Sequence, residues 1–216
     1  MNCGAVIEPQ ADYCEGCRDT MPFITGERCE NCGEALKTCT CRKHRFHYQS
    51  VIAPFYYEGG AKRAVLKLKQ YPVYALPLAK ECKSVIEMCY GSEAFDFVCC
   101  VPMHPKKQRQ SGFNQSEALA REIAKQIGVP FVPALKALFE TKPQHSLGNR
   151  LRAGNVRGVY DVMEECQVKN KSVLLVDDIK TSGATLNECA LMLQLNGARS
   201  VRCVVAAIRK TQREGN

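Results

Sequence analysis

The chain has 216 residues, a formal net charge of +8 and 45% hydrophobic residues, which suits one α/β core with a small appendage. No apolar run approaches the ~20 residues that a membrane-spanning helix needs, and the N-terminus lacks the basic and apolar regions of a signal peptide. We therefore expect a cytoplasmic chain, in which the 14 cysteines do not form a disulfide framework.

Residues 1–48 are rich in cysteine and charge, and they are too short to fold around a core without a staple. Cysteine pairs on tight turns can place their thiolates on one tetrahedral Zn²⁺. The predicted ligands of one structural zinc site are Cys29, Cys32, Cys39 and Cys41. A second site would have only Cys3, Cys14 and Cys17. Redox-active or merely structural thiols are the alternative.

From Val51 onward, strand-like and helix-like patterns alternate. The predicted strands are 51–57, 97–101, 159–162, 172–176 and 201–208. The predicted helices are 61–69, 75–89, 116–127 and 186–195, and residues 103–112 are predicted to form a basic loop. This rhythm predicts an α/β domain over residues 49–216, with a mainly parallel sheet and helices on both faces.

Seven further cysteines are scattered among apolar neighbours in this second domain. Cysteine in such a setting usually behaves as a small buried hydrophobe. We expect this of Cys82, Cys89, Cys99, Cys100, Cys166, Cys189 and Cys203.

The segment Val173–Thr185 carries the main functional signal. Its four apolar residues Val173–Val176 predict a strand buried on both faces, and ligands of open α/β sheets bind beyond the carboxyl ends of such strands. Asp177 and Asp178 are predicted to lie at that end, and the turn after them opens a helix whose N–H groups suit a phosphate. Two adjacent carboxylates fit ribose hydroxyls, held directly or through Mg²⁺. Alternatively, the acids and threonines only cap the helix.

Within the turn, Gly183 allows close backbone approach, and the hydroxyl groups can donate to phosphate oxygens. The predicted phosphate-binding residues are Thr181, Ser182, Gly183, Ala184 and Thr185. The segment resembles the phosphoribosyl pyrophosphate (PRPP) signature of type I phosphoribosyltransferases. Ser182 stands where that signature usually has a threonine, and Lys180 stands where it commonly has an apolar residue.

Two basic stretches without acidic residues precede this segment, at 97–116 and 141–160. A pyrophosphate needs lysine, arginine and backbone N–H groups around it. The candidate residues are Lys107, Arg109 and Arg152. A solvated basic face, one that contacts nucleic acid included, is the alternative.

The basic stretches also carry the closest family resemblance. Val101–Pro105, Arg109 and Gly112-Phe-Asn-Gln115 resemble the ComF family of competence-associated, phosphoribosyltransferase-like proteins. So do Gln144, Leu147, Arg152, Asn155 and Arg157-Gly158. Ser111 replaces an arginine that this family usually has. The resemblance covers roughly residues 50–210, and in related transferases the second basic stretch is a mobile loop that closes over PRPP.

The N-terminal segment is similar to the double zinc ribbon that opens many ComF proteins. In that ribbon the first pair also reads Cys-x-x-Cys-Gly, and Cys3-Gly4 matches its second half. The resemblance implies that the start is truncated or wrongly assigned, or that the first site is incomplete. His44 and His47 are weak substitute ligands.

The resemblance implies two kinds of function. One is a phosphoribosyltransferase that transfers the phosphoribosyl group of PRPP to an unknown acceptor, with Asp177 and Asp178 holding the ribose and stabilising charge at the anomeric carbon. Its base would be Asp161 or His145, both weak candidates. The other is a non-catalytic PRPP sensor or single-stranded-DNA-binding accessory protein. ComF relatives act in DNA uptake during natural transformation, beside a helicase-like partner.

Overall fold

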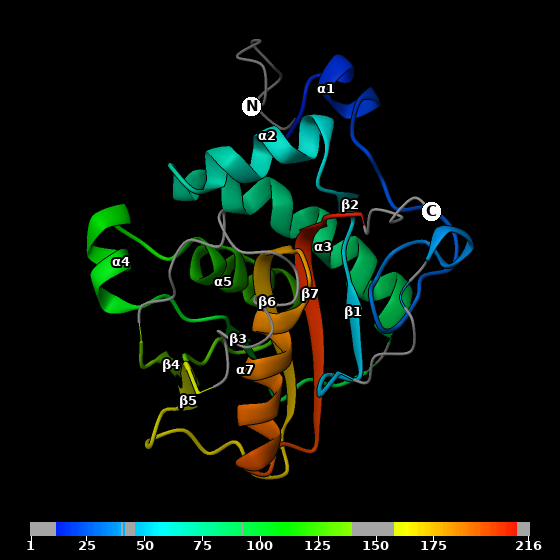
Figure 1. Ribbon diagram of the computed structural model, residues 1–216. Coiled ribbons are helices and arrows are strands. Elements are labelled where there is room, and N and C mark those ends of the chain that lie inside the picture. Colours follow the sequence, from blue (N-terminus) through cyan, green and yellow to red (C-terminus); the bar gives the residue numbers. More distant parts are fainter. Residues whose placement is uncertain (1–11, 40, 42–45, 92, 140–157, 211–216) are drawn as a thin grey trace, which may run out of the picture.

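The computed structural model describes residues 12–39, 41, 46–91, 93–139 and 158–210, and it is built around one parallel sheet (Figure 1). The strand order is β1-β7-β6-β3, with β2 following β1 along the same edge of β7, and every pairing in this sheet is parallel. The strands are β1 (Ser50–Ile52), β2 (Phe55–Tyr56), β3 (Phe97–Cys100), β6 (Ser172–Lys180) and β7 (Ser200–Ile208). A separate antiparallel pair consists of β4 (Leu135–Ala137) and β5 (Tyr160–Val162).

Helices cover both faces of the main sheet, which confirms the predicted α/β class. Alternate residues of β6 enter two cores: Leu174 and Val176 join the core under α2, α3 and α5, whereas Val173 and Leu175 join the core under α7. The helices are α1 (Glu15–Asp19), α2 (Gly59–Leu68), α3 (Ala75–Tyr90), α4 (Pro105–Ser111), α5 (Gln115–Ile127) and α7 (Ala184–Leu195), with short 3₁₀ turns at Leu36–Thr38 and Pro72–Tyr74.

Three local predictions need correction. The strand predicted at 51–57 is interrupted at Pro54, which has no N–H to donate to a ladder, so that β1 and β2 are separate. The basic stretch predicted as a loop contains helix α4: Pro105 begins it, the His104 side chain accepts a hydrogen bond from the Lys106 N–H, and Gly112 ends it at φ +83°. The third is β6, which continues four residues beyond its predicted end at Val176.

The prediction that all seven scattered cysteines are buried holds for five of them. Cys89 is exposed and Cys166 is only partly buried. Cys89 lies near the C-terminal end of α3, next to the exposed Met88, whereas the following residue, Tyr90, is buried and donates to the Cys203 carbonyl of β7, so Cys89 lies on the face of the helix that is turned away from the sheet. Helical periodicity rather than residue type decides burial at this position.

The cysteine-rich segment packs against one edge of the main sheet through backbone and side-chain contacts. The Ile24 N–H donates to the Pro54 carbonyl over 2.9 Å, and the Val51 N–H donates to the Glu30 carbonyl over 3.0 Å. The Ala35 N–H donates to the Tyr56 hydroxyl over 3.1 Å. The segment is therefore fastened to β1 and β2. Across the described ranges, no helix is long and apolar enough to cross a membrane.

Candidate ligand site

The two predicted aspartates lie where β6 extends beyond the end of the neighbouring strand β3. β3 pairs with β6 only as far as Cys100 opposite Val176, whereas β7 stays paired to the last residue of β6, Lys180 opposite Ile208. Asp177 and Asp178 therefore lie inside the strand but beyond the end of β3, so one edge of the strand is without a ladder partner there. This is the carboxyl end of a parallel sheet, as predicted for a ligand site.

Asp177 is a buried carboxyl group held by two donors. Its Oδ1 atom accepts from the Ser116 hydroxyl over 2.7 Å and from the Asp178 N–H over 2.9 Å. Burial and the neighbouring Asp178 carboxylate raise the pKa of Asp177 to about 8, and the two hydrogen bonds offset this only in part. We therefore expect Asp177 to keep its proton at neutral pH as long as no cation lies beside it.

Asp178 is bound from two helices. Its Oδ2 atom lies 3.2 Å from the Lys69 Nζ atom and accepts from the Gln115 side-chain amide over 3.3 Å. Burial opposes the ammonium form of Lys69, but the Asp178 carboxylate outweighs it and raises the pKa of Lys69. This lysine was absent from the sequence prediction. The available signal was its place one helical turn after the buried Val65, on the apolar face of α2.

The Gly-Phe-Asn-Gln motif has a structural explanation at this site. Asn114 is buried, accepts from the Ser116 N–H at the start of α5, and donates to the Val101 carbonyl at the end of β3 over 3.1 Å. It thereby fixes α5 against the sheet. The next two residues, Gln115 and Ser116, then reach the two aspartates. The motif positions the acidic pair from the side that β3 leaves open.

The turn after β6 leads into α7 through a glycine with positive φ. Gly183 has φ +83° and immediately precedes α7, whose first N–H groups have no partners within the helix. The Ala184 N–H donates to the Ser182 hydroxyl over 3.3 Å. Thr181 and Ser182 are exposed, and the half-buried Thr185 forms a side-chain hydrogen bond with Tyr160. The turn therefore offers both hydroxyl and backbone donors.

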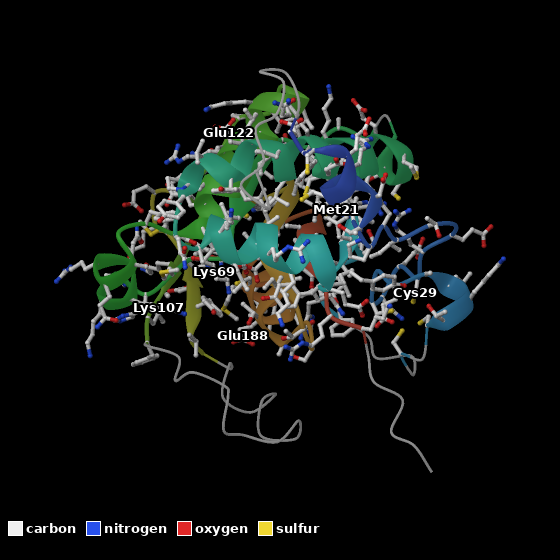
Figure 2. The ribbon with its side chains drawn as sticks, turned by 90° about the horizontal axis from the view of Figure 1, so that it is seen from above. Met21, Cys29, Lys69, Lys107, Glu122 and Glu188 are labelled. Atoms are coloured by element: carbon white, nitrogen blue, oxygen red, sulfur yellow. The ribbon has the colours of Figure 1, made fainter. Side chains whose placement is uncertain are left out.

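The two predicted basic residues that the structure describes, Lys107 and Arg109, are not joined to the acidic pair. Lys107 and Arg109 are exposed on α4, and within the described ranges no ion pair or side-chain hydrogen bond joins them to Asp177 or Asp178. Figure 2 shows Lys107 at one side of the molecule and Lys69 nearer its centre. Arg152 and His145 lie outside the described residues, as does the whole of 140–157, which contains most of the second basic stretch.

Four of the seven predicted zinc ligands form one cluster. Cys29, Cys32, Cys39 and Cys41 have their sulfur atoms within 4.8 Å of one another, so these four could hold a metal ion. Neighbouring sulfurs are 3.4, 3.4 and 3.2 Å apart, far longer than a disulfide bond. A tetrahedron with Zn–S bonds of ~2.3 Å has edges of about 3.8 Å, which the cluster approaches. Its chemistry and shape fit Zn²⁺.

The second predicted zinc site is not assembled in the described residues. Cys14 precedes α1 and Cys17 lies within it, but no third ligand joins them in the described ranges. Cys3 and His44 lie outside these ranges. His47 is described, and its backbone binds the side chains of Asn187 and Gln194 on α7.

The comparisons with known proteins match just under half of the chain to a named domain. The model of the phosphoribosyl transferase domain matches residues 114–216. This stretch contains the acidic pair, the turn and α7, together with Asn114, Gln115 and Ser116. With the parallel sheet covered by helices, this match shows the type I phosphoribosyltransferase fold, and the cysteine cluster is consistent with an appended zinc ribbon.

Three relatives carry names that refer to DNA utilization or to competence. The chain is 31% identical over 113 residues to DNA utilization protein YhgH of Salmonella typhimurium, covering 52% of this chain and 49% of that protein. It is 26% identical over 104 residues to competence protein F of Haemophilus influenzae, covering 47% and 45%. It is 26% identical over 204 residues to competence protein ComFC of Streptococcus pneumoniae, covering 88% and 84%. The chain thus spans about half the length of the first two.

Solved structures give weaker likenesses. Glutamine PRPP amidotransferase of B. subtilis aligns with a TM-score of 0.43 and 18% identity, covering 65% of this chain and 30% of that one. Adenine phosphoribosyltransferase of Saccharomyces cerevisiae aligns with a TM-score of 0.41 and 13% identity, covering 66% and 81%. These scores are too low to support any statement about ligands.

Proposed function

The chain belongs to the ComF family, whose members have a phosphoribosyltransferase-like domain and are named for their role in competence. We propose that it binds PRPP and Mg²⁺ at the end of β6. The observation that supports this most directly is the juxtaposition of Asp177 and Asp178 with the Gly183 turn at the start of α7. An acidic pair suits ribose hydroxyls or a divalent cation, and a helix start suits a phosphate.

In this proposal the acidic pair would hold the ribose, and its carboxylate oxygens would hold Mg²⁺. A bound Mg²⁺ would supply positive charge between ribose and pyrophosphate oxygens. Ser116 and Gln115 already orient Asp177 and Asp178. The 5′-phosphate would lie on the turn 181–185, where hydroxyl and backbone donors converge.

Lys69 is our added candidate for the pyrophosphate half. Its ammonium group forms an ion pair with the Asp178 Oδ2 atom at the open edge of β6, and the Lys69 side chain is 42% exposed. An ammonium group in this place can turn from the carboxylate to a bound anion when a cation takes over the acidic pair. Lys107, Arg109 and Arg152 stay sequence predictions for the same half.

Transfer of the phosphoribosyl group to an acceptor is the catalytic form of this proposal. Asp161 is poorly placed as its base: Tyr160 and Val162 on either side of it are buried, so Asp161 faces away from them, and its Oδ1 atom accepts from the Val162 N–H. The alternative is a PRPP-binding protein without transfer. Screening nucleobases and amines for pyrophosphate release separates the two, because only a transferase releases it.

The names of the relatives support a role in DNA uptake, and the charge of +8 is compatible with it. A cytoplasmic location stays a prediction from the sequence. Direct contact with single-stranded DNA or a helicase-like partner stays a prediction from the sequence. Its test is salt-dependent binding of an oligonucleotide to the full chain and to a chain without residues 1–48. Equal binding by both would show that the ribbon is not the DNA contact.

Calorimetry with PRPP, in the presence and absence of Mg²⁺, tests the proposed site. We expect binding that requires Mg²⁺ and that weakens about tenfold or more in Asp178→Asn, since a charge-assisted contact is lost. Asp161→Asn is the matched control and should bind as the wild type does. No heat from the wild type at millimolar PRPP would overturn the proposal.

Replacing Lys69 by methionine tests the pyrophosphate contact separately. The change keeps an apolar stem against α2 but removes the ammonium group, so we expect affinity for PRPP to fall about tenfold. Inorganic pyrophosphate should compete less well with PRPP in this variant. Lys67→Met on the same helix is the control. Unchanged affinity in Lys69→Met would exclude this lysine from the ligand site.

A further inference from the structure

Lys180 is the residue of the ligand segment that the PRPP signature does not explain. It ends β6 and is only 4% exposed, which is unusual for a lysine. A buried ammonium group is costly unless negative charge compensates it. The question is therefore which group supplies that charge.

The ionisable groups whose negative charge would favour the ammonium form of Lys180 belong to the cysteine cluster and to Glu34 beside it. Burial lowers the pKa of Lys180, and the groups that act against burial are Cys32, Glu34, Cys41 and Cys29. The strand register explains this proximity. Lys180 pairs with Ile208, and a Cβ atom at Gly33, beside Cys32, would lie 2.5 Å from the Ile208 Cδ1 atom. The cluster thus lies beside the end of β6.

The same lysine supports the turn that follows it. A Cβ atom at Gly183 would lie 3.2 Å from the Lys180 Cε atom and 3.1 Å from the Tyr48 hydroxyl oxygen. Tyr48 in turn donates to the Asn31 carbonyl over 3.0 Å, within the turn that joins Cys29 to Cys32. The Gly183 turn therefore rests on two side chains that both reach the cysteine cluster.

We propose that Lys180 is a positioning residue that links the cysteine cluster to the ligand turn. Four thiolates around one Zn²⁺ carry a net charge of about −2, which the ammonium group of Lys180 partly balances. Its aliphatic stem packs under Gly183 and fixes the turn. The claim that this turn then receives a ligand rests on the proposed function, whereas the link between metal and turn does not.

The link has a direct physical consequence. Removing the metal and protonating the thiols takes away the negative charge that keeps the ammonium group buried. Lys180 then turns toward water, and its stem leaves the underside of Gly183. By reciprocity, a ligand that fixes the turn tightens metal binding by the same factor. The metal centre and the ligand site are therefore coupled through one side chain.

Two substitutions in the full, zinc-loaded chain separate the charge from the stem. Lys180→Met keeps most of the stem, so we expect zinc affinity, measured by competition with a chromophoric chelator, to fall about tenfold. Amide exchange of residues 181–185 in the loaded protein should stay within about twofold of wild type. Lys180→Ala should lose the same zinc affinity and exchange these amides at least about fivefold faster. Lys125→Met, on the exposed part of α5, should change neither.

Each readout can overturn its part of the proposal. Wild-type zinc affinity in Lys180→Met excludes the role of the charge, and wild-type exchange in Lys180→Ala excludes the role of the stem. Neither measurement uses PRPP. If the wild type binds no PRPP, the proposed function fails while zinc affinity and amide exchange still decide on Lys180. If it does bind, the affinity for PRPP should fall in Lys180→Ala.

Discussion

Asp177→Asn is expected to make the ligand-free protein more stable above pH 7 and at the same time to abolish binding of PRPP with Mg²⁺. The two effects have one cause. The site keeps a carboxyl group buried beside a second carboxylate, and this arrangement is unfavourable until a cation or ribose is bound.

The sign of the stability effect follows from the proton balance. In the folded state Asp177 is expected to keep its proton up to about pH 8, whereas in the unfolded chain it loses the proton near the ordinary pKa of an aspartate, 3.8. Between these values the unfolded state binds fewer protons, so the free energy of unfolding falls as pH rises. Asparagine has no proton to lose in this pH range, so Asp177→Asn avoids this fall in the free energy of unfolding. One pKa unit is worth about 1.4 kcal/mol, and we expect a gain of at least that size at pH 8.

The gain should depend on pH in a defined way. At pH 4 the wild type and Asp177→Asn should unfold with similar free energies, and the difference should grow until about pH 8. The amide keeps the acceptor for Ser116 and can donate toward Asp178, so packing is retained. Urea denaturation at several pH values, without Mg²⁺, measures this. A constant difference from pH 4 to 8 would contradict the argument.

Asp96→Asn is a control of opposite sign. Asp96 accepts from the Ser172 N–H over 2.7 Å and pairs with Lys171, and these contacts lower its pKa. Its contribution is therefore present above the unfolded pKa and is lost as pH falls through the folded one. Asp96→Asn should destabilise the protein at neutral pH and leave PRPP binding unchanged, because the residue lies at the other end of β6.

The arrangement of layers could be predicted from sequence because the apolar runs are long and unambiguous. Val173–Val176 and Val201–Ile208 have no polar alternation that would place one face in water, and both are central strands. Helix α4 was missed because Lys106–Gln110 has no apolar periodicity. Its helical state depends on Pro105 and on the cap at His104.

For the site itself, only residues that belong to one continuous sequence motif could be predicted. The motif at β6 indicated Asp177, Asp178 and Gly183, and the cysteine spacing indicated Cys29, Cys32, Cys39 and Cys41. The partners of these residues come from other elements. Lys69 reaches Asp178 from α2, and Lys180 reaches the cysteine cluster because of the register between β6 and β7. Such contacts depend on strand order and register, which no single motif encodes.

Removing one cysteine of the cluster is expected to cost more stability than any other single change outside the core. Cys32→Ser should lower the free energy of unfolding by about 3 kcal/mol or more, since the metal would lose a ligand and the turn its staple. Cys32 is buried, and the next residue, Gly33, lies against Val51 of β1 and Ile208 of β7, so the loss should spread to these two strands. Thermal unfolding tests this expectation, and the metal content of each sample is measured in parallel.

Chelation of the wild type should reproduce the defect, and it should not lower the stability of Cys32→Ser much further, because both remove the same metal. Cys89→Ser is the matched control: this thiol is exposed, lies outside the cluster, and should leave stability and metal content unchanged. The metal content also gives the number of zinc ions per chain. The described cluster accounts for one zinc per chain, and a second would require Cys14 and Cys17 to find further ligands outside the described residues. Equal stability of the wild type with and without chelator would show that the four thiols hold the ribbon together without a metal.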